Sequence, residues 1–151
     1  MRMNKMGSVF CILSLCFSSG AMSNPTIGTA SDLEKHLVEG CVVRAIIDTH
    51  ICESSTPYGD GIFGIDFSIF NIYTIPADGA MKKIIATSFA TPTHHRTYGP
   101  VLNYARVRVA YDDSVEFFSE TIDIGTGKSL ESYAIHCHIN KGVKLFSSCK
   151  K

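Results

Sequence analysis

The sequence lacks an excess of charge of either sign. Its 14 lysines and arginines balance 14 aspartates and glutamates, so the chain has no basic field that would favour nucleic acid as a partner. It also lacks the composition of a disordered or collagen-like chain, because 45% of its residues are hydrophobic and 19% are charged. No repeat, low-complexity tract or interdomain linker interrupts the 151 residues, which suit one domain together with a processed segment.

Long hydrophobic runs are also missing. The stretch from Val9 to Phe17 contains a single polar residue, but it is about half the length that a transmembrane helix needs. Arg2 and Lys5 precede it, and small residues follow it over positions 18–23. A positive start, a short apolar run and small residues are typical of a secretory signal peptide. We therefore predict that residues 1–23 are a signal peptide.

The small residues also predict where the signal peptide ends. Ala21 and Ser23 fit the positions three and one before a cleavage site, which places the cut before Asn24. A cut after Ala21, with Ser19 three positions before it, fits nearly as well. We expect residues 24–151 to form a single domain in the periplasm or the medium, with no stable membrane insertion after cleavage.

Four cysteines remain beyond the predicted signal peptide, namely Cys41, Cys52, Cys137 and Cys149. An even number of cysteines in an exported chain predicts two disulfides. Cys41 and Cys52 lie at the two ends of one predicted strand, roughly 25 Å apart at the usual rise per residue. They cannot pair, because a bridge needs Cα atoms within about 7 Å. Two pairings remain, and we favour Cys52–Cys137 together with Cys41–Cys149.

One short helix is expected near the start of the domain. Ser31 is a suitable N-cap, Glu34 lies three residues later as in a capping box, and Gly40 is a stop signal. The apolar residues expected on one face are Leu33, Leu37 and Val38.

The rest of the domain is predicted to be strands. The run from Cys41 to Ile47 is β-branched and apolar, which favours a strand buried on both faces. Three hairpins follow, with a polar loop over Thr91–Pro100 after the first. Their paired strands are Ile62–Ile75 with Met81–Phe89, Val101–Ala110 with Val115–Ile124, and Ser132–Ile139 with Val143–Phe146.

The second hairpin permits a register prediction. If its loop has three residues, Val109 lies opposite Val115, and Arg108 lies opposite Glu116 on the other face. A slip by one residue would mix apolar and charged side chains on each face, so the pattern selects this register. We therefore predict an α+β fold, predominantly antiparallel β, with one short N-terminal helix and a curled meander sheet or partly closed barrel.

Histidines are the most suggestive candidates for chemistry. His136 and His138 alternate around Cys137, so in a strand both point to one side, at a spacing that two metal ligands could use. The remaining candidate ligands are His50, His94 and His95. The competing interpretation is that His136 and His138 face solvent while Cys137 points inward to a disulfide.

The sequence contains no recognisable catalytic constellation, so we assign no catalytic residue and no cofactor. Aromatic side chains are abundant in the predicted strands, and some fall on both faces. Either both faces are covered, or one aromatic strip is exposed to a partner. The aromatic residues concerned are Phe63, Phe67, Phe70, Tyr73, Phe89, Tyr104, Phe117 and Phe118.

Several motifs together resemble the VirK family of exported bacterial proteins linked to virulence. They are, in chain order, a short helix and strand ending Asp48-Thr49-His50-Ile51-Cys52, the segment Gly61-Ile62-Phe63-Gly64, a strand with Phe70 and Tyr73 before Asp78-Gly79, and the run from Cys137 to Phe146. The resemblance covers about residues 30–146. It implies that Cys52 and Cys137 are the cysteine pair shared by the family, which supports the favoured pairing, and that Cys41 and Cys149 are an addition.

The resemblance implies a virulence-associated protein of unassigned activity, with no catalytic residue to carry over. We expect a non-enzymatic module that binds an unknown protein, host partner or ligand. The alternative is a metal-binding protein or metal-dependent enzyme that uses His136 and His138 with His50, His94 or His95.

Overall fold

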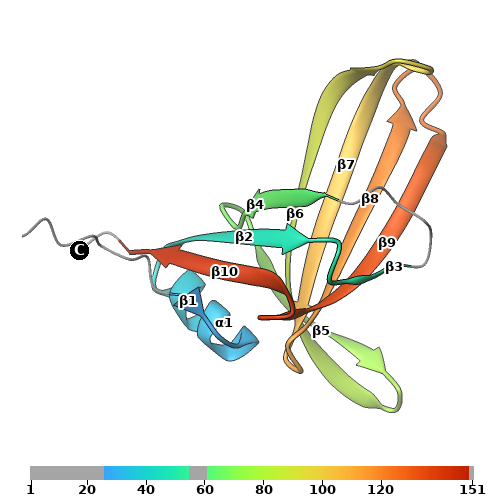
Figure 1. Cartoon of the computed structure of the whole chain (residues 1–151). Helices are drawn as coiled ribbons and strands as arrows, with labels where there is room; N and C mark the ends of the chain where they lie inside the picture. The colour runs from blue at the N-terminus through green and yellow to red at the C-terminus, as the bar shows by residue number, and fades with distance from the viewer. Residues whose placement is uncertain (1–25, 55–60, 150–151) are drawn as a thin grey trace, which may run out of the picture.

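A curled sheet of ten strands and one helix make up the computed structural model, which describes residues 26–54 and 61–149 (Figure 1). The predicted signal peptide lies outside these residues. In chain order the elements are β1 (Thr26–Ile27), α1 (Ala30–Val38), β2 (Val42–Asp48), β3 (Glu53–Ser54), β4 (Ile62–Asp66), β5 (Asn71–Ala77), β6 (Ala80–His95), β7 (Gly99–Ala110), β8 (Ser114–Asp123), β9 (Ser129–Ile139) and β10 (Gly142–Ser148). No helix among them has the length and apolar character needed to cross a membrane.

The sheet is open rather than closed on itself. Its strand order is β4-β2-β10-β9-β8-β7-β6-β5, and the short strands β1 and β3 pair with β10 and β9. Figure 1 shows two parts, the long strands β6 to β9 and the shorter β2, β4 and β10, which run in a different direction. The predicted α+β fold with a curled, mostly antiparallel sheet is therefore confirmed.

The local pairing of β7 and β8 agrees with the predicted register. Val109 lies opposite Val115, and Arg108 lies opposite Glu116. The predicted turn before β6 also forms, with Asp78 and Gly79 at positive φ between the paired strands β5 and β6, which is the backbone that a two-residue hairpin turn needs.

The helix begins earlier than predicted. Thr29 is the N-cap, and its hydroxyl accepts a hydrogen bond from the backbone N–H of Asp32. The Thr29–Asp32 pair therefore takes the place of the predicted capping pair Ser31–Glu34. Leu33 is buried as expected, but Val38 is 69% exposed, because the chain leaves the helix at that point.

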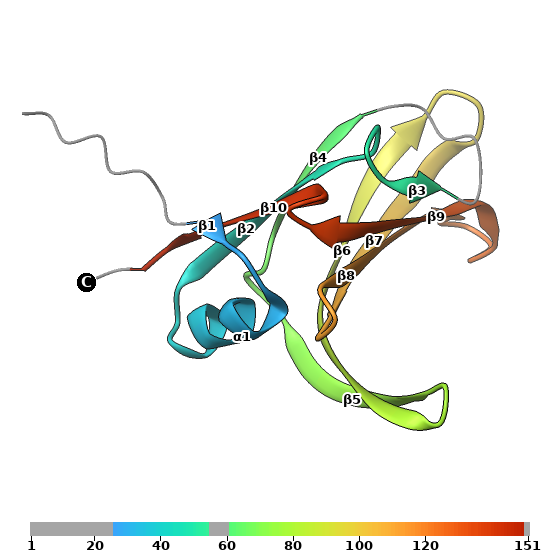
Figure 2. The same ribbon diagram turned by 60° about the horizontal axis from the view of Figure 1, so that its bottom comes forward.

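The core lies between α1 and the inner face of the sheet, which we define as the face toward α1 (Figure 2). Its fully buried side chains are Ile27, Leu33, Ile47, Ile85, Ile135, Leu145, Val43, Val101, Val107, Val109, Val115 and Val143. Side chains that alternate with them point to the opposite, outer face.

Two of the predicted strand arrangements are wrong. The predicted strand Ile62–Ile75 divides into β4 and β5, which form the two ends of the sheet. The predicted third hairpin does not form either, because β9 and β10 share only two paired positions, in parallel, and β10 then runs along β2. Asn140 and Gly142, both at positive φ, redirect the chain between these strands.

Candidate functional site

The two histidines of β9 lie on its outer face. His136 and His138 are exposed, whereas Cys137 between them is buried, as the alternation of a strand requires. His136 lies opposite Glu116 of β8 and Glu53 of β3. Both imidazoles therefore face outward, that of His136 beside two carboxylates, and the cysteine points into the core.

His94 and His95 lie far from this pair. They end β6, which continues through most of the predicted polar loop. Across the sheet, His136 pairs with Glu116 of β8, Glu116 pairs with Arg108 of β7, and Arg108 pairs with Ala86 of β6. His95 is nine residues beyond Ala86 along β6. At the usual rise, that separates the two sites by about 30 Å along the strands.

The structure does not assemble the predicted set of metal ligands. His50 lies after β2, where its Nδ1 is 3.1 Å from Asp48 Oδ1. Among the described residues, one group of at least three histidine, cysteine or acidic side chains has its ligand atoms within 4.8 Å of one another: His36, Cys41 and Cys149. Both of these cysteines are oxidised in a disulfide, so they offer no thiolate to a metal.

Both ends of β2 are held by disulfides. Cys41, just before β2, is bonded to Cys149, just after β10, with Cα atoms 4.2 Å apart. Cys52, in the turn after β2, is bonded to Cys137 of β9, with Cα atoms 4.7 Å apart. This is the pairing that we favour from the sequence. The two bridges therefore join the ends of β2 to β9 and to the end of β10, the last two strands of the chain.

The outer side of β2 carries apolar side chains in solvent. Val43, Ala45 and Ile47 point inward and are fully buried, but Val42 is 56% exposed and Ile46 is 36% exposed. The prediction that this strand is buried on both faces is therefore wrong. An apolar run does not show which of its two faces another layer covers, and here nothing among the described residues covers the outer one.

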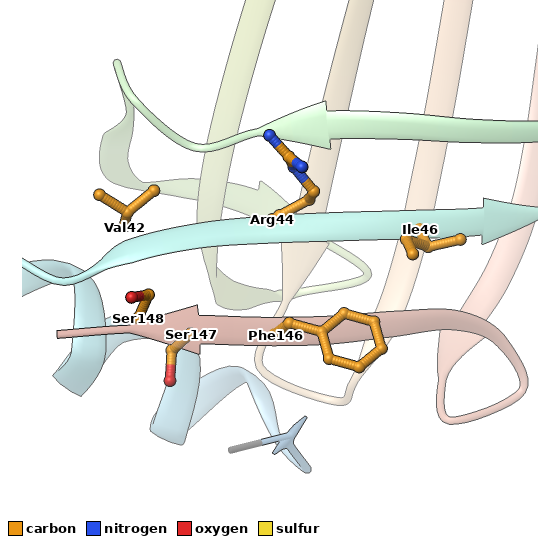
Figure 3. A pocket seen from close by; sticks show the side chains of 6 residues that line it. All are labelled: Val42, Arg44, Ile46, Phe146, Ser147 and Ser148. Atoms are coloured by element: carbon orange, nitrogen blue, oxygen red, sulfur yellow. The ribbon is translucent and has the colours of Figure 1, made fainter. Parts of the chain in front are cut away.

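Neighbouring strands extend this surface. Phe146 of β10 is half-buried and lies opposite Arg44, and Ile62 of β4, 70% exposed, lies opposite Asp48. A hollow of about 430 Å³ opens between β2 and β10 (Figure 3). The labelled side chains around it are Val42, Arg44, Ile46, Phe146, Ser147 and Ser148.

A second hollow of about 280 Å³ shares Ile46 with the first and also involves Ile51 and Ile62. Gly64 of β4 lies opposite Ile46 of β2. Apart from Gly64 and its two chain neighbours, no atom lies within 4 Å of the position that a Cβ of residue 64 would occupy. We name the surface formed by Val42, Ile46, Ile51, Ile62 and Phe146 the β2 face. It is contiguous and apolar, which is the character of an interaction site.

Charged side chains lie on and beside the β2 face, and one of them, Arg44, lies between Val42 and Ile46 at the first hollow (Figure 3). Arg44 donates two hydrogen bonds to Asp66, at 2.6 Å from Nε and 3.1 Å from Nη2. These hydrogen bonds lower the pKa of Asp66 and raise that of Arg44. Lys144 lies opposite Ile46 on the β10 side. Apolar and aromatic side chains with an arginine among them are typical of protein interfaces.

Most of the aromatic side chains singled out in the sequence are buried or half-buried, so the alternative of an exposed aromatic strip is not the one that forms. Phe63, Phe117 and Tyr133 pack together at the core, with ring centroids 5.4 Å apart for the two phenylalanines. Phe89 is exposed, but Phe146, the aromatic residue of the β2 face, was not among those singled out. The alternation of β10 around Val143 and Leu145 is the signal that could have placed it on the outer side.

Comparison with known proteins identifies one family. The model of the VirK protein family matches residues 26–126. A crystal structure of a VirK family protein from Legionella pneumophila has the same fold, with a TM-score of 0.68 and 15% sequence identity. The similarity covers 80% of this chain and 98% of that one. No curated protein sequence matches the chain.

Proposed function

The chain belongs to the VirK family, and from that premise we propose that it is an exported, virulence-associated module that binds another protein without catalysing a reaction. The observation that carries the proposal is the β2 face, an apolar surface presented by strands that two disulfides hold in place. A surface of this kind binds a partner that supplies apolar side chains of its own.

Export is supported by the cysteines and by the sequence before the domain. Disulfides persist in oxidising compartments and are rare in the bacterial cytosol. Both bridges connect segments far apart in the sequence, with separations of 108 and 85 residues. Bridges that close loops of this length stabilise the folded chain by restricting its unfolded state.

The perturbed carboxylates of the described residues are explained by surface hydrogen bonds, without a catalytic role. Among the described residues, the acids with a lowered pKa are Asp66, Asp112 and Asp123, and each is explained by hydrogen bonds that it accepts at the surface. Catalytic carboxylates usually have their pKa shifted by burial in a cleft.

The test is a pair of charge substitutions in the β2 face. Ile46→Asp and Ile62→Asp each place a carboxylate at the apolar centre of the proposed interface, where it would lose its hydration without gaining a partner. We expect recovery of the native partner from cells that produce the protein to fall about tenfold or more for each variant.

Met81→Asp is the matched control. Met81 is 65% exposed, comparable with Ile62, but it lies in β6 at the other end of the sheet order. It should recover the same partner as the unmodified protein, with all four chains melting cooperatively. Equal recovery by all of them, or loss through Met81→Asp alone, would refute the β2 face as the binding surface.

A further inference from the structure

Another hollow, distinct from the two at the β2 face, lies on the long-strand part of the outer face. It has a volume of about 310 Å³ and is bordered by β5 to β9. Its polar lining is Lys82, Arg108, Ser114, Glu116, His136 and His138. We infer that it binds a small organic oxyanion, a carboxylate or phosphate group attached to a short apolar chain.

Two guanidinium groups share one carboxylate beside this hollow. Arg106 Nη2 lies 3.0 Å from Glu116 Oε1, and Arg108 Nη1 lies 3.6 Å from the same oxygen. Glu116 therefore balances one of the two positive charges. The other arginine retains an uncompensated charge in a half-buried site, which favours the approach of an anion.

The hydrogen bonds of the two arginines are incomplete as well. In the part of the chain that the structure describes, the Nε atoms of Arg106 and Arg108 are buried and have no hydrogen-bond acceptor. Leaving a buried N–H donor unpaired costs free energy. The Arg108 side chain is 34% exposed and borders the hollow, so its outer N–H groups, not the buried Nε, are the donors that a carboxylate or phosphate oxygen could meet.

Arg108 is the better placed of the two to meet a ligand. Arg106 lies over the ring of Phe118, 5.1 Å from its centroid, and does not border the hollow. Arg108 borders it, in a row across three strands with Glu116 and His136. Glu116 lies between the other two in this row, so the backbones of Arg108 and His136 are about 10 Å apart, and a ligand needs a chain of several atoms beyond its oxyanion to contact both.

The other charges around the hollow do not change its sign. Lys82 borders it and forms a 2.8 Å ion pair with Asp112, so this pair is neutral. The two histidines add positive charge when they are protonated. Glu53, opposite His136, and Lys141 border a smaller hollow beside the two histidines, and their formal charges cancel. The formal count therefore leaves the one excess arginine charge beside the hollow, whatever the state of its imidazoles.

An apolar wall completes the site. Ile84 and Ala110 belong to a small buried cluster on the outer face, with Ile75 packed against it, and all three border the hollow. Convergent polar donors beside an apolar wall are typical of small-molecule sites, and 310 Å³ is at the lower end of their size range. The wall accommodates an alkyl group of a few carbons.

The experiment is an NMR titration of the folded domain, residues 24–151, with hexyl phosphate, hexanoate, inorganic phosphate and hexanol as separate probes. We expect hexyl phosphate or hexanoate to shift the imidazole signals of His136 and His138 saturably, at concentrations up to about 10 mM. The ratio of their affinities distinguishes a phosphate from a carboxylate ligand. Hexanol, which has the chain without the charge, should bind at least tenfold more weakly.

Arg108→Gln should weaken binding of the charged probe about tenfold or more. Arg44→Gln is the matched control, because Arg44 is also paired with a carboxylate but lies on the β2 face. If Arg108→Gln does not fold, Arg108→Lys keeps the charge without the planar fork and should also bind more weakly.

Several results would overturn the inference: no saturable shift, hexanol binding as well as the anions, or equal loss in Arg108→Gln and Arg44→Gln. Zinc ions alone provide a further arm. The hollow would be assigned to a metal instead if zinc shifts the imidazole signals of His136 and His138, if Arg108→Gln leaves that shift unchanged, and if none of the anions binds.

Discussion

At the scale of single residues, Gly142 has the least room for a side chain among the glycines that the structure describes. Its φ is +90°, and a side chain at this position would begin 2.5 Å from Cys52 Sγ and 3.5 Å from Cys137 Cβ. The backbone therefore passes against the Cys52–Cys137 disulfide at the point where β10 leaves β9. Only glycine meets both requirements, a left-handed backbone and no side chain.

We predict that Gly142→Ala lowers the free energy of unfolding by about 2–4 kcal/mol, since it combines a steric clash with an unfavourable backbone. Gly127→Ala is the control, because Gly127 also has positive φ, +68°, but has open space around it. That change should cost about 1 kcal/mol. Urea denaturation of both variants measures the difference, and equal losses would show that the disulfide does not constrain Gly142.

Asp112 has the most strongly perturbed carboxyl group. The side-chain hydrogen bond from Lys82 and those from Ser114 hold its pKa well below the ordinary value of 3.8. An acid with a lowered pKa stabilises the folded state while it is ionised, and this contribution is lost as the pH falls through that lowered pKa. More than half of the side chain is exposed, so the contribution is modest.

We predict that Asp112→Asn is less stable than the unmodified protein at pH 7. The difference in free energy of unfolding should shrink as the pH falls below about 4 and disappear once Asp112 is protonated. Unfolding curves across this range measure it. In a Lys82→Met background the difference at pH 7 should be smaller, and an unchanged difference would contradict Lys82 as the main cause.

At the scale of elements, α1 covers the inner face through a narrow stripe. Leu33 is fully buried, whereas Val38, at the end of the same helix, faces solvent. The sequence assigns both residues to one face, because helical periodicity continues past the point where packing ends. The two positions therefore provide an internal comparison.

We predict that Leu33→Ala lowers the free energy of unfolding by about 2–4 kcal/mol, through lost burial and the cavity that it leaves. Val38→Ala should change it by less than about 0.5 kcal/mol. Chemical denaturation followed by circular dichroism compares the two. A similar loss for both would mean that α1 does not pack on the sheet in the way described.

The β7–β8 hairpin was predictable from the sequence because its determinants are local. Val109 with Val115 and Arg108 with Glu116 separate apolar from charged side chains across a short turn. The β9–β10 connection contains similar turn residues, Asn140 to Gly142, but its direction depends on pairing with β2 and on a disulfide to Cys52. Those contacts are distant in sequence, so the turn residues alone indicated a hairpin that does not form.

The candidate site was only partly predictable for the same reason. The alternation around Cys137 correctly placed the two histidines of β9 outside, since a strand has two faces. Whether the outer side of β2 is covered depends on which elements lie above it, and its β-branched run contains no information about that. The apolar β2 face therefore emerged from the structure.

At the scale of the whole molecule, the outer face of the sheet presents two chemically different surfaces. The β2 face is apolar with charged side chains on and beside it, and it lies on the short strands that the disulfides join. The hollow around Arg108 and His136 lies on the long strands and has excess positive charge. Because one sheet carries both, a protein partner and a small anion could be bound at the same time.

The most direct measurement is site-specific photo-crosslinking in cells that produce the protein. A photoreactive amino acid is placed at Ile46 or Ile62 on the β2 face, and at Met81 or Ile124 as exposed controls elsewhere. The account predicts one covalent adduct of the same mass from both β2-face positions and none from the controls. Adducts from Met81 or Ile124 in equal or greater yield, or no adduct at Ile46 and Ile62, would contradict it.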